Sequence, residues 1–413
     1  MLKDIGIKAQ KASQDLKNLD SELKNQIIHD MSLQLLHDKE EILEANSSDI
    51  KNANNLELSS ALLDRLTLSE ERLKAMSLGL QKIISLPDPV NSISSSWKTK
   101  EGLNINKIRS PFGVIGVIYE ARPNVTSDVS ALCIKSGNAV ILKGSSYCLD
   151  SNSQILNSLQ AALKSNDVDI NSVQLIKSKN REDAIKFMQM KEYIDLIVPR
   201  GGRGLIDTLV ENAKVPFILD GDGNVHLYIH EDAKREYINN IVINSKVQRP
   251  GVCNALETLL IHRKIYEEVG HEIISTLIEN QVQLFVEKDI LKDFPSLQEV
   301  TQEHFETEFH DLKLAIGLVD TLDEAINHVQ KYSSGHTEGI LTESTDASSK
   351  FSSSIDSSVI FINTSTRFTD GEMFGFGAEV GISTQKLHVR GPMGLEALTT
   401  ERYVIETEGI IRE

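Results

Sequence analysis

The sequence predicts an α/β protein with two parallel sheets, and two observations support this prediction. Short apolar runs typical of buried strands alternate with helical patterns from Val114 to Leu219. A second alternation of the same kind runs from Thr258 to Asn363. Such alternation is typical of parallel sheets with crossover helices, whose ligands gather at the carboxyl ends of the strands. Because 413 residues exceed what one core usually fills, we expect two or three domains.

Composition excludes several classes of partner. The chain is 40% hydrophobic and 25% charged, as is ordinary for a globular protein, and its net charge is -17. That charge repels nucleic acid and anionic membrane surfaces. An anionic substrate must therefore meet locally placed arginines or lysines.

The cysteines and the N-terminus indicate a cytoplasmic protein. Cys133, Cys148 and Cys253 are odd in number and far apart, which argues against a disulfide framework. The N-terminus turns polar within a few residues, and no stretch approaches the roughly 20 apolar residues of a membrane span. No metal-binding spacing is present, so we expect no metal.

The first 86 residues have a helical pattern. Apolar residues repeat at helical spacing from Leu23 to Leu35, and Ser69 followed by two glutamates suits a helix start. The polar stretch Ser92–Trp97 then leads into a half-buried strand over Leu103–Ile108.

The first alternation contains five strands and four helices. The strands are expected at Val114–Tyr119, Ala139–Leu142, Val173–Ile176, Leu196–Val198 and Val215–Leu219, and the helices at Val125–Ser136, Asp150–Leu163, Arg181–Met190 and Leu205–Asn212.

The second alternation follows a helical pattern that ends near Val247. Its strands are expected at Thr258–His262, Gln283–Val286, Leu314–Val319, Gly339–Thr342 and Val359–Asn363, with helices at Ile265–Glu279 and Leu322–Tyr332. The tail Arg402–Thr407 is again strand-like.

Cys253 is a candidate nucleophile. Pro250-Gly251 predicts a turn between a helix and a strand, so the thiol lies near backbone amides that regular structure has not used. Arg249 precedes it by four residues, and a nearby cation favours the reactive thiolate. The alternative from these residues alone is a packed free cysteine, the commoner fate of this residue type.

Two strand-exit segments could hold a cofactor. Lys143-Gly-Ser-Ser146 offers an ammonium and hydroxyls to a ribose and its phosphate, although an ordinary loop would read the same. Pro199-Arg-Gly-Gly-Arg-Gly204 opens a helix whose amides suit a phosphate, but it lacks the dinucleotide fingerprint spacing.

Taken together, these segments resemble the aldehyde dehydrogenase superfamily. The resemblance rests on Ser110–Thr126, Gly137–Ser146, Val198–Gly202, Asp220–His226 and the Cys253 stretch, in that order. It implies the aldehyde dehydrogenase-like fold: a Rossmann-like cofactor domain, an α/β catalytic domain and a small β oligomerisation element. The expected bounds are 1–230 for the NADP-binding domain, with 99–110 in the oligomerisation element, 231–365 for the catalytic domain, and 366–413 for the return and the oligomerisation tail.

The resemblance also implies residue roles. Cys253 matches the nucleophile, and Arg122 or Asn124 lies near the oxyanion position, with the choice left open. The matches to the cofactor site are Lys143, Ser145, Ser146, Arg200, Gly201, Gly202 and Glu308. The cations expected to bind the anionic substrate are Arg122, Arg249 and Arg367.

The implied activity is NADPH-dependent reduction of L-glutamate 5-phosphate to L-glutamate 5-semialdehyde and phosphate, the second step of proline biosynthesis. Hydrolytic members have a glutamate that activates water where this chain reads Asp220-Gly-Asp-Gly223, which favours phosphate over water as the acyl acceptor. The resemblance further implies a homo-oligomer, a dimer or tetramer, and leaves open a transient contact with glutamate 5-kinase. The alternatives are another semialdehyde dehydrogenase of this fold and a non-catalytic scaffold.

Overall fold

A computed structural model describes residues 1–55, 60–219 and 221–412. The chain divides into two compact units. Unit 1 comprises Met1–Leu219, Gly375–Gly381 and Met393–Glu413, and unit 2 comprises Asp220–Phe374 and Ile382–Pro392. No helix of the described residues is long and apolar enough to cross a membrane.

Unit 1 begins with an N-terminal group of helices, as the sequence predicts. Ser69 caps α5 by accepting a hydrogen bond from the amide of Arg72 at 3.2 Å. The helices of unit 1 are α1 (Leu2–Leu16), α2 (Ser21–His37), α3 (Lys39–Asn54), α4 (Ser60–Leu66), α5 (Glu70–Ile84), α6 (Asn124–Lys135), η1 (Ser146–Cys148), α7 (Leu149–Ser165), η2 (Ile170–Ser172), α8 (Arg181–Met188), α9 (Arg203–Asn212) and η5 (Leu395–Leu398).

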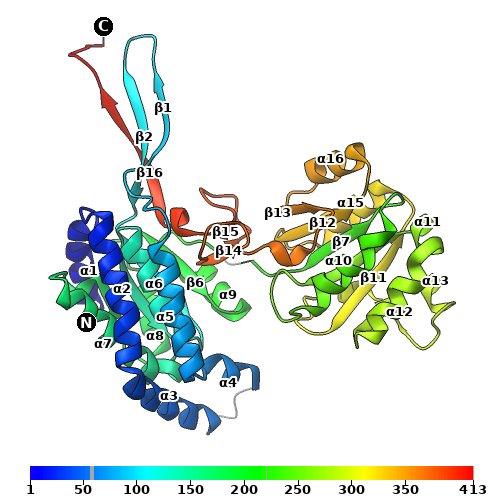
Figure 1. The fold of residues 1–413 in the computed structure, drawn as a ribbon, viewed down its shortest axis with the longest axis horizontal. Coiled ribbons are helices and arrows are strands. Elements are labelled where there is room, and N and C mark those ends of the chain that lie inside the picture. Colours follow the sequence, from blue (N-terminus) through cyan, green and yellow to red (C-terminus); the bar gives the residue numbers. More distant parts are fainter. Residues whose placement is uncertain (56–59, 220, 413) are drawn as a thin grey trace. The chain divides into compact units, whose positions relative to one another are not determined.

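A four-stranded parallel sheet forms the centre of unit 1, in the order β5-β4-β3-β6. Every residue of β3 and β4 is buried, as their continuous apolar runs predict. Helices α1, α6 and α7 pack against this sheet (Figure 1). Its strands are β3 (Val114–Tyr119), β4 (Ala139–Gly144), β5 (Val173–Leu175) and β6 (Leu196–Arg200).

A three-stranded antiparallel sheet, which we call the arm, projects from unit 1 (Figure 1). It consists of β1 (Ile93–Lys98), β2 (Asn104–Pro111) and β16 (Thr399–Glu406), with β2 in the centre. Two strand-like segments were predicted outside the α/β alternations, Leu103–Ile108 and Arg402–Thr407. They correspond to β2 and β16, which pair with each other. The arm leaves β1 and β16 as edge strands.

Unit 2 is built on a seven-stranded parallel sheet in the order β10-β9-β11-β8-β7-β12-β13. Its strands are β7 (Val225–Ile229), β8 (Leu256–His262), β9 (Gln283–Val286), β10 (Gln298–Glu299), β11 (Lys313–Val319), β12 (Thr337–Leu341) and β13 (Val359–Ile362). Two short strands, β14 (Gly381–Ser383) and β15 (Gly391–Met393), pair separately.

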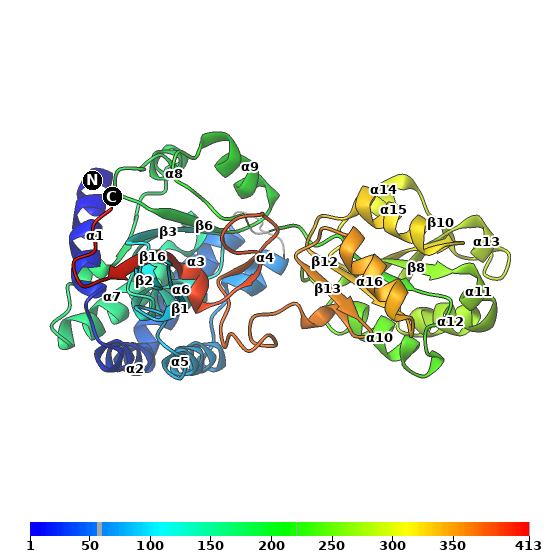
Figure 2. The same ribbon diagram turned by 90° about the horizontal axis from the view of Figure 1, so that it is seen from above.

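Helices cover both faces of the large sheet, and each face has its own apolar core. Val242 and Ile274 belong to the core that α10 and α12 form with one face, whereas Val329 and Phe351 bring α15 and α16 to the other (Figure 2). The helices of unit 2 are α10 (Arg235–Val247), α11 (Arg263–Ile265), the π-helix η3 (Tyr266–Gly270), α12 (His271–Glu279), α13 (Lys288–Leu291), α14 (Gln302–Glu306), α15 (Leu322–Tyr332), α16 (Thr345–Ser354) and η4 (Thr366–Phe368).

Several elements differ from the sequence prediction. Val215–Leu219 is not a strand: it makes only an isolated bridge between Phe217 and Ile197, and Pro216 has no amide hydrogen for a ladder. Strands β1 and β7 were not predicted, because β1 is exposed along its whole length and β7 is too short to show a period. The predicted helix Ile265–Glu279 begins with a π-turn, where Gly270 lies against the Tyr266 ring.

The unit boundaries also differ from those expected. Unit 2 begins at residue 220 rather than 231, because β7 pairs with β8 and β12 of the seven-stranded sheet. It continues to Phe374 rather than 365, because the segment after β13 returns to the amino end of β12. There the Thr369 hydroxyl lies 2.8 Å from that of Thr337.

Candidate active site

A pocket of about 300 Å³ opens at the carboxyl end of the unit 1 sheet, where ligands of parallel sheets are expected. Its lining combines apolar side chains with a few charged and polar ones, a combination that suits a nucleoside. The lining residues are Ile118, Tyr119, Glu120, Lys143, Gly144, Ser145, Arg181, Ala184, Ile185, Met188, Gly204, Leu205 and Thr208.

Lys143 and Ser145 reach this pocket from the carboxyl end of β4, and their role in cofactor binding stays a prediction. Burial lowers the pKa of the Lys143 ammonium, while the Cys148 and Asp183 charges act in the opposite direction. The ammonium donates to the carbonyl of Gly144 at 3.0 Å. Ser145 caps the short helix that Ser146 begins, and Ser146 does not line the pocket.

Arg181 is a cofactor candidate that the sequence reasoning missed. It is the first residue of α8, lines the same pocket as Lys143, and donates to the Thr208 hydroxyl at 3.4 Å. Two cations therefore face one pocket of an acidic protein. The sequence contains only a weak signal for Arg181, because a solvent-facing arginine at a helix start is common.

The glycine turn after β6 allows close packing at the start of α9. A Cβ on Gly201 would lie 2.8 Å from Glu120 Cδ, so a larger residue there would require the Glu120 side chain to move. Gly202 is the N-cap of α9, and Arg200 is the last residue of β6. These three predicted residues lie next to the pocket rather than in its lining.

Arg122 and Asn124 follow the end of β3, also in unit 1. The amide of Arg122 donates to the carbonyl of Glu120, and the Asn124 side chain donates to Asp128 at 2.9 Å. Burial raises the pKa of Asp128 to about 6, with Asn124, Ser127 and Arg200 acting against that rise. The geometry of unit 1 does not decide between Arg122 and Asn124 as the oxyanion donor.

Cys253 lies in the turn between α10 and β8 in unit 2, and its side chain is partly exposed. Asn254 anchors this turn: its side chain donates to the Thr369 carbonyl at 2.7 Å, and its own carbonyl accepts from the Thr366 hydroxyl at 2.9 Å. Gly223 packs so closely that an added Cβ would lie 1.7 Å from the Cys253 carbonyl oxygen. The turn is therefore held from both sides.

Arg249 and Arg367, two of the three arginines predicted to bind the substrate, lie in unit 2, where the charge of Arg249 acts on Arg367. Burial and the neighbouring Arg249 lower the pKa of Arg367, whereas Cys253 and Asp370 raise it. The Arg367 side chain donates to Gln248 at 2.8 Å. Arg249, Arg367 and Cys253 thus form one electrostatic neighbourhood, and the third predicted arginine, Arg122, belongs to unit 1.

Glu308 lies in the segment that leads into β11. Its side chain is 12% exposed, and one carboxylate oxygen lies 3.2 Å from His310 Nε2. The other oxygen is buried and has no hydrogen-bond partner among the described residues. The Glu308 carboxylate therefore keeps one acceptor that no described residue uses.

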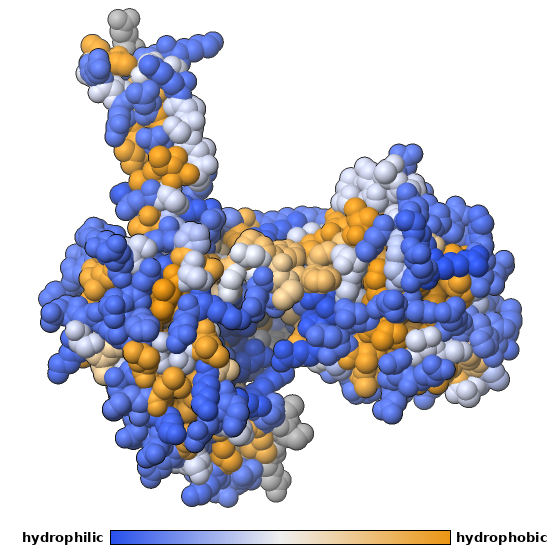
Figure 3. All heavy atoms as spheres, viewed as in Figure 1, coloured by the Kyte–Doolittle hydropathy of each residue, from blue (hydrophilic) through white to orange (hydrophobic). Residues whose placement is uncertain are grey.

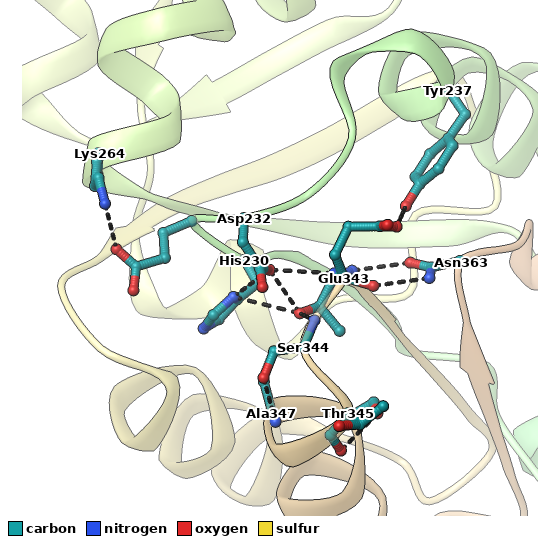
Figure 4. Close-up of polar contacts among 12 residues, drawn as sticks. His230, Asp232, Tyr237, Lys264, Glu343, Ser344, Thr345, Ala347 and Asn363 are labelled. Atoms are coloured by element: carbon teal, nitrogen blue, oxygen red, sulfur yellow. Dashed lines mark hydrogen bonds and ion pairs between the residues drawn. The ribbon is translucent and has the colours of Figure 1, made fainter.

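In unit 2 the candidate residues gather at the amino edge of the sheet, contrary to expectation. Gly223, Cys253 and Glu308 precede β7, β8 and β11 respectively. The carboxyl edge is instead occupied by a polar network (Figure 4). There Asp232 accepts from the Thr342 hydroxyl at 2.6 Å, and Asn363 pairs with the Thr342 backbone.

The chain is similar to known proteins over nearly its whole length. The model of the aldehyde dehydrogenase family matches residues 6–294. A gamma-glutamyl phosphate reductase of Heliobacterium modesticaldum is 45% identical and covers 98% of each chain. One of Bacillus cereus is 46% identical and covers 99% of this chain and 98% of its own.

Solved structures agree. The crystal structure of gamma-glutamyl phosphate reductase from Thermotoga maritima matches with a TM-score of 0.97 and 40% identity, covering 100% of both chains. An acetylating aldehyde dehydrogenase from Geobacillus thermoglucosidasius shares the fold, with a TM-score of 0.69 at 15% identity.

The chain therefore belongs to the aldehyde dehydrogenase family, with the aldehyde dehydrogenase-like fold that the sequence predicts. Gamma-glutamyl phosphate reductases are among the relatives in that family that match it over nearly their whole length.

Proposed function

We propose that this protein reduces L-glutamate 5-phosphate to L-glutamate 5-semialdehyde and phosphate with NADPH, the second step of proline biosynthesis from glutamate. The observation that carries the proposal is 45% identity to a gamma-glutamyl phosphate reductase over 98% of both chains. The site agrees with it, because unit 2 presents a cysteine in a turn beside two arginines.

Cys253 is the nucleophile in this mechanism. Its thiolate attacks the acyl carbon, the bond from that carbon to the phosphate oxygen breaks, and a thioester on Cys253 remains as phosphate leaves. Backbone amides of the turn stabilise the oxyanion, together with Arg122 or Asn124. Arg249 and Arg367 neutralise the substrate phosphate or its α-carboxylate.

The bound dinucleotide supplies the hydride that reduces the thioester carbon. The thiohemiacetal on Cys253 then collapses, the carbon–sulfur bond breaks, and the thiolate is regenerated with release of the aldehyde. Asp220 lies outside the described residues. Gly223, in the same segment, packs against the turn of Cys253.

The assay for this function runs the reaction in reverse. Purified protein with glutamate semialdehyde, NADP⁺ and phosphate is expected to form NADPH, followed by its absorbance. Absence of NADPH formation with all three present, in protein whose folding is verified by circular dichroism, would contradict the assignment.

The cofactor assignment has support in the unit 1 pocket. The apolar lining suits adenine, and Lys143 with Arg181 can share the 2′-phosphate that distinguishes NADP from NAD. Ser145 and Ser146 supply hydroxyls nearby. Glu308 of unit 2 is the proposed acceptor for the nicotinamide ribose.

Replacement of Arg181 by alanine is expected to raise the KM for NADP⁺ roughly 10- to 100-fold, the effect of one charge-assisted contact to phosphate. The KM for NAD⁺ should change less than twofold, since NAD⁺ lacks the phosphate. Lys186→Ala on the same helix is the control, because its ammonium is 61% exposed and lies 3.9 Å from Asp183. Equal effects on both cofactors would argue against 2′-phosphate recognition.

A homo-oligomer formed through the arm is proposed as the working assembly. Ile93, Trp97, Tyr403 and Ile405 are between 43% and 60% exposed on the arm, and apolar side chains mark it in Figure 3. Its two outer strands offer unpaired backbone groups. A cytoplasmic location and a transient contact with glutamate 5-kinase stay predictions.

Substitution of Ile405 by aspartate is expected to shift the protein to a smaller species in light scattering after size exclusion, because a charge would be buried at the interface. Ile170→Asp, at a residue 41% exposed in unit 1 outside the arm, is the matched control and should leave the mass unchanged. An unchanged mass for both variants would place the interface elsewhere.

A further inference from the structure

A fully buried ion pair joins α10 and β8, the two elements on either side of the turn that carries Cys253. We call this turn, residues 248–255, the cysteine turn. Lys246, near the end of α10, lies 2.7 Å from Glu257 of β8, and neither side chain is exposed. Burial lowers the pKa of Lys246 and raises the pKa of Glu257 to about 7. A buried ion pair is often no more stable than apolar residues of the same size, so stability alone does not account for its presence.

The same pair reaches the segment that carries Glu308. The second carboxylate oxygen of Glu257 accepts the backbone amide of His310 at 3.3 Å. His310 has a φ of 54°, a left-handed conformation that needs support from its surroundings. The Glu308 charge acts on both Lys246 and Glu257. One buried cation therefore stabilises two neighbouring carboxylates.

The cysteine turn and the Glu308 segment also lie next to each other. A Cβ on Gly251 would lie 3.5 Å from the His310 carbonyl oxygen. Glu308 keeps one buried oxygen without a hydrogen-bond partner among the described residues. A ribose diol could donate to the partly exposed Glu308 carboxylate only if the segment holds that carboxylate in a fixed place.

We propose that Lys246 and Glu257 are positioning residues for the cofactor, which hold the 307–311 segment so that the Glu308 carboxylate faces the nicotinamide ribose hydroxyls. Neither residue touches the substrate, since both side chains are fully buried. The proposal rests on the proposed function for its cofactor. It assigns the pair to cofactor binding rather than to the chemistry at Cys253.

The test is a double-mutant cycle between Glu257→Gln and Glu308→Gln in the full-length protein, with KM for NADP⁺ and kcat measured separately. Glu308→Gln and Glu257→Gln should each raise the KM for NADP⁺ roughly tenfold, with kcat falling less than threefold. In the Glu308→Gln background, Glu257→Gln should add less than a twofold change, because it acts through Glu308.

Two further variants make the test independent of folding. Lys246→Met combined with Glu257→Gln removes both buried charges and should show the same increase in KM with the fold retained. Asp88→Asn is the matched control: Asp88 pairs with the buried Lys24 at 2.9 Å in unit 1, and its loss should lower thermal stability without changing KM.

Additive effects of Glu257→Gln and Glu308→Gln on KM would overturn the proposal, as would an unchanged KM in Glu308→Gln alone or in the Lys246→Met/Glu257→Gln variant. The proposed function is tested separately by the NADPH formation of the unaltered protein. If the unaltered protein is active in that assay and the effects of Glu257→Gln and Glu308→Gln on KM are additive, the positioning role is rejected and the enzyme assignment stands.

Discussion

Replacement of Cys253 by alanine is expected to lower kcat by about 10⁴-fold or more, the scale seen when a covalent nucleophile is removed. Without the sulfur no thioester can form, and no other cysteine can substitute for it. Cys133 and Cys148 are buried, and burial raises the pKa of both thiols well above the usual range. NADPH formation from glutamate semialdehyde, NADP⁺ and phosphate measures the loss.

Cys133→Ala is the matched control for this prediction. Cys133 is fully buried in α6, away from the pocket lining, so its replacement should leave kcat within about twofold while lowering stability by about 1 kcal/mol. If Cys253→Ala retained more than a tenth of the activity, the thioester mechanism would be wrong for this protein.

Replacement of Gly223 by alanine is expected to lower kcat/KM about 100-fold, the consequence of moving a catalytic group by about 1 Å. The new Cβ would lie 1.7 Å from the Cys253 carbonyl oxygen, a backbone atom, so either segment must shift. The free energy of unfolding should fall by about 1–3 kcal/mol, as for other overpacked sites. Steady-state kinetics and thermal unfolding measure the two effects.

Gly79→Ala provides the matched control. Its added Cβ would meet no atom within 4 Å, and Gly79 lies inside α5, away from the pocket lining, where alanine favours the helix. Normal activity in both variants would mean that Gly223 does not hold the cysteine turn in the active enzyme.

Most of the fold could be predicted from the sequence where apolar patterns are long. The continuous runs in Val114–Tyr119 and Leu256–His262 are buried central strands, and the Ser69 cap begins a helix. Prediction failed where this signal is absent. The arm strand Ile93–Lys98 is wholly exposed, so its sequence shows no buried face.

The candidate site was predictable in part. Cys253 and Lys143 could be found because turn residues or a strand end mark them, and the structure places Cys253 in the turn between α10 and β8 and Lys143 near the end of β4. Gly223 approaches Cys253 closely, and Lys246 pairs with Glu257. The sequence could not predict these contacts, because the residues in each pair share no local pattern. Arg181 was missed for the same reason: only the folded pocket brings it to Lys143.

Dependence of turnover on phosphate tests acyl-phosphate chemistry most directly. Enzyme is mixed with glutamate semialdehyde and NADP⁺ without phosphate, NADPH absorbance is followed from the first turnover, and phosphate is then added. We expect a burst of about one NADPH per Cys253 and no steady state until phosphate releases the thioester. Steady turnover without phosphate would show that water resolves the thioester, and the protein would then be a hydrolytic aldehyde dehydrogenase.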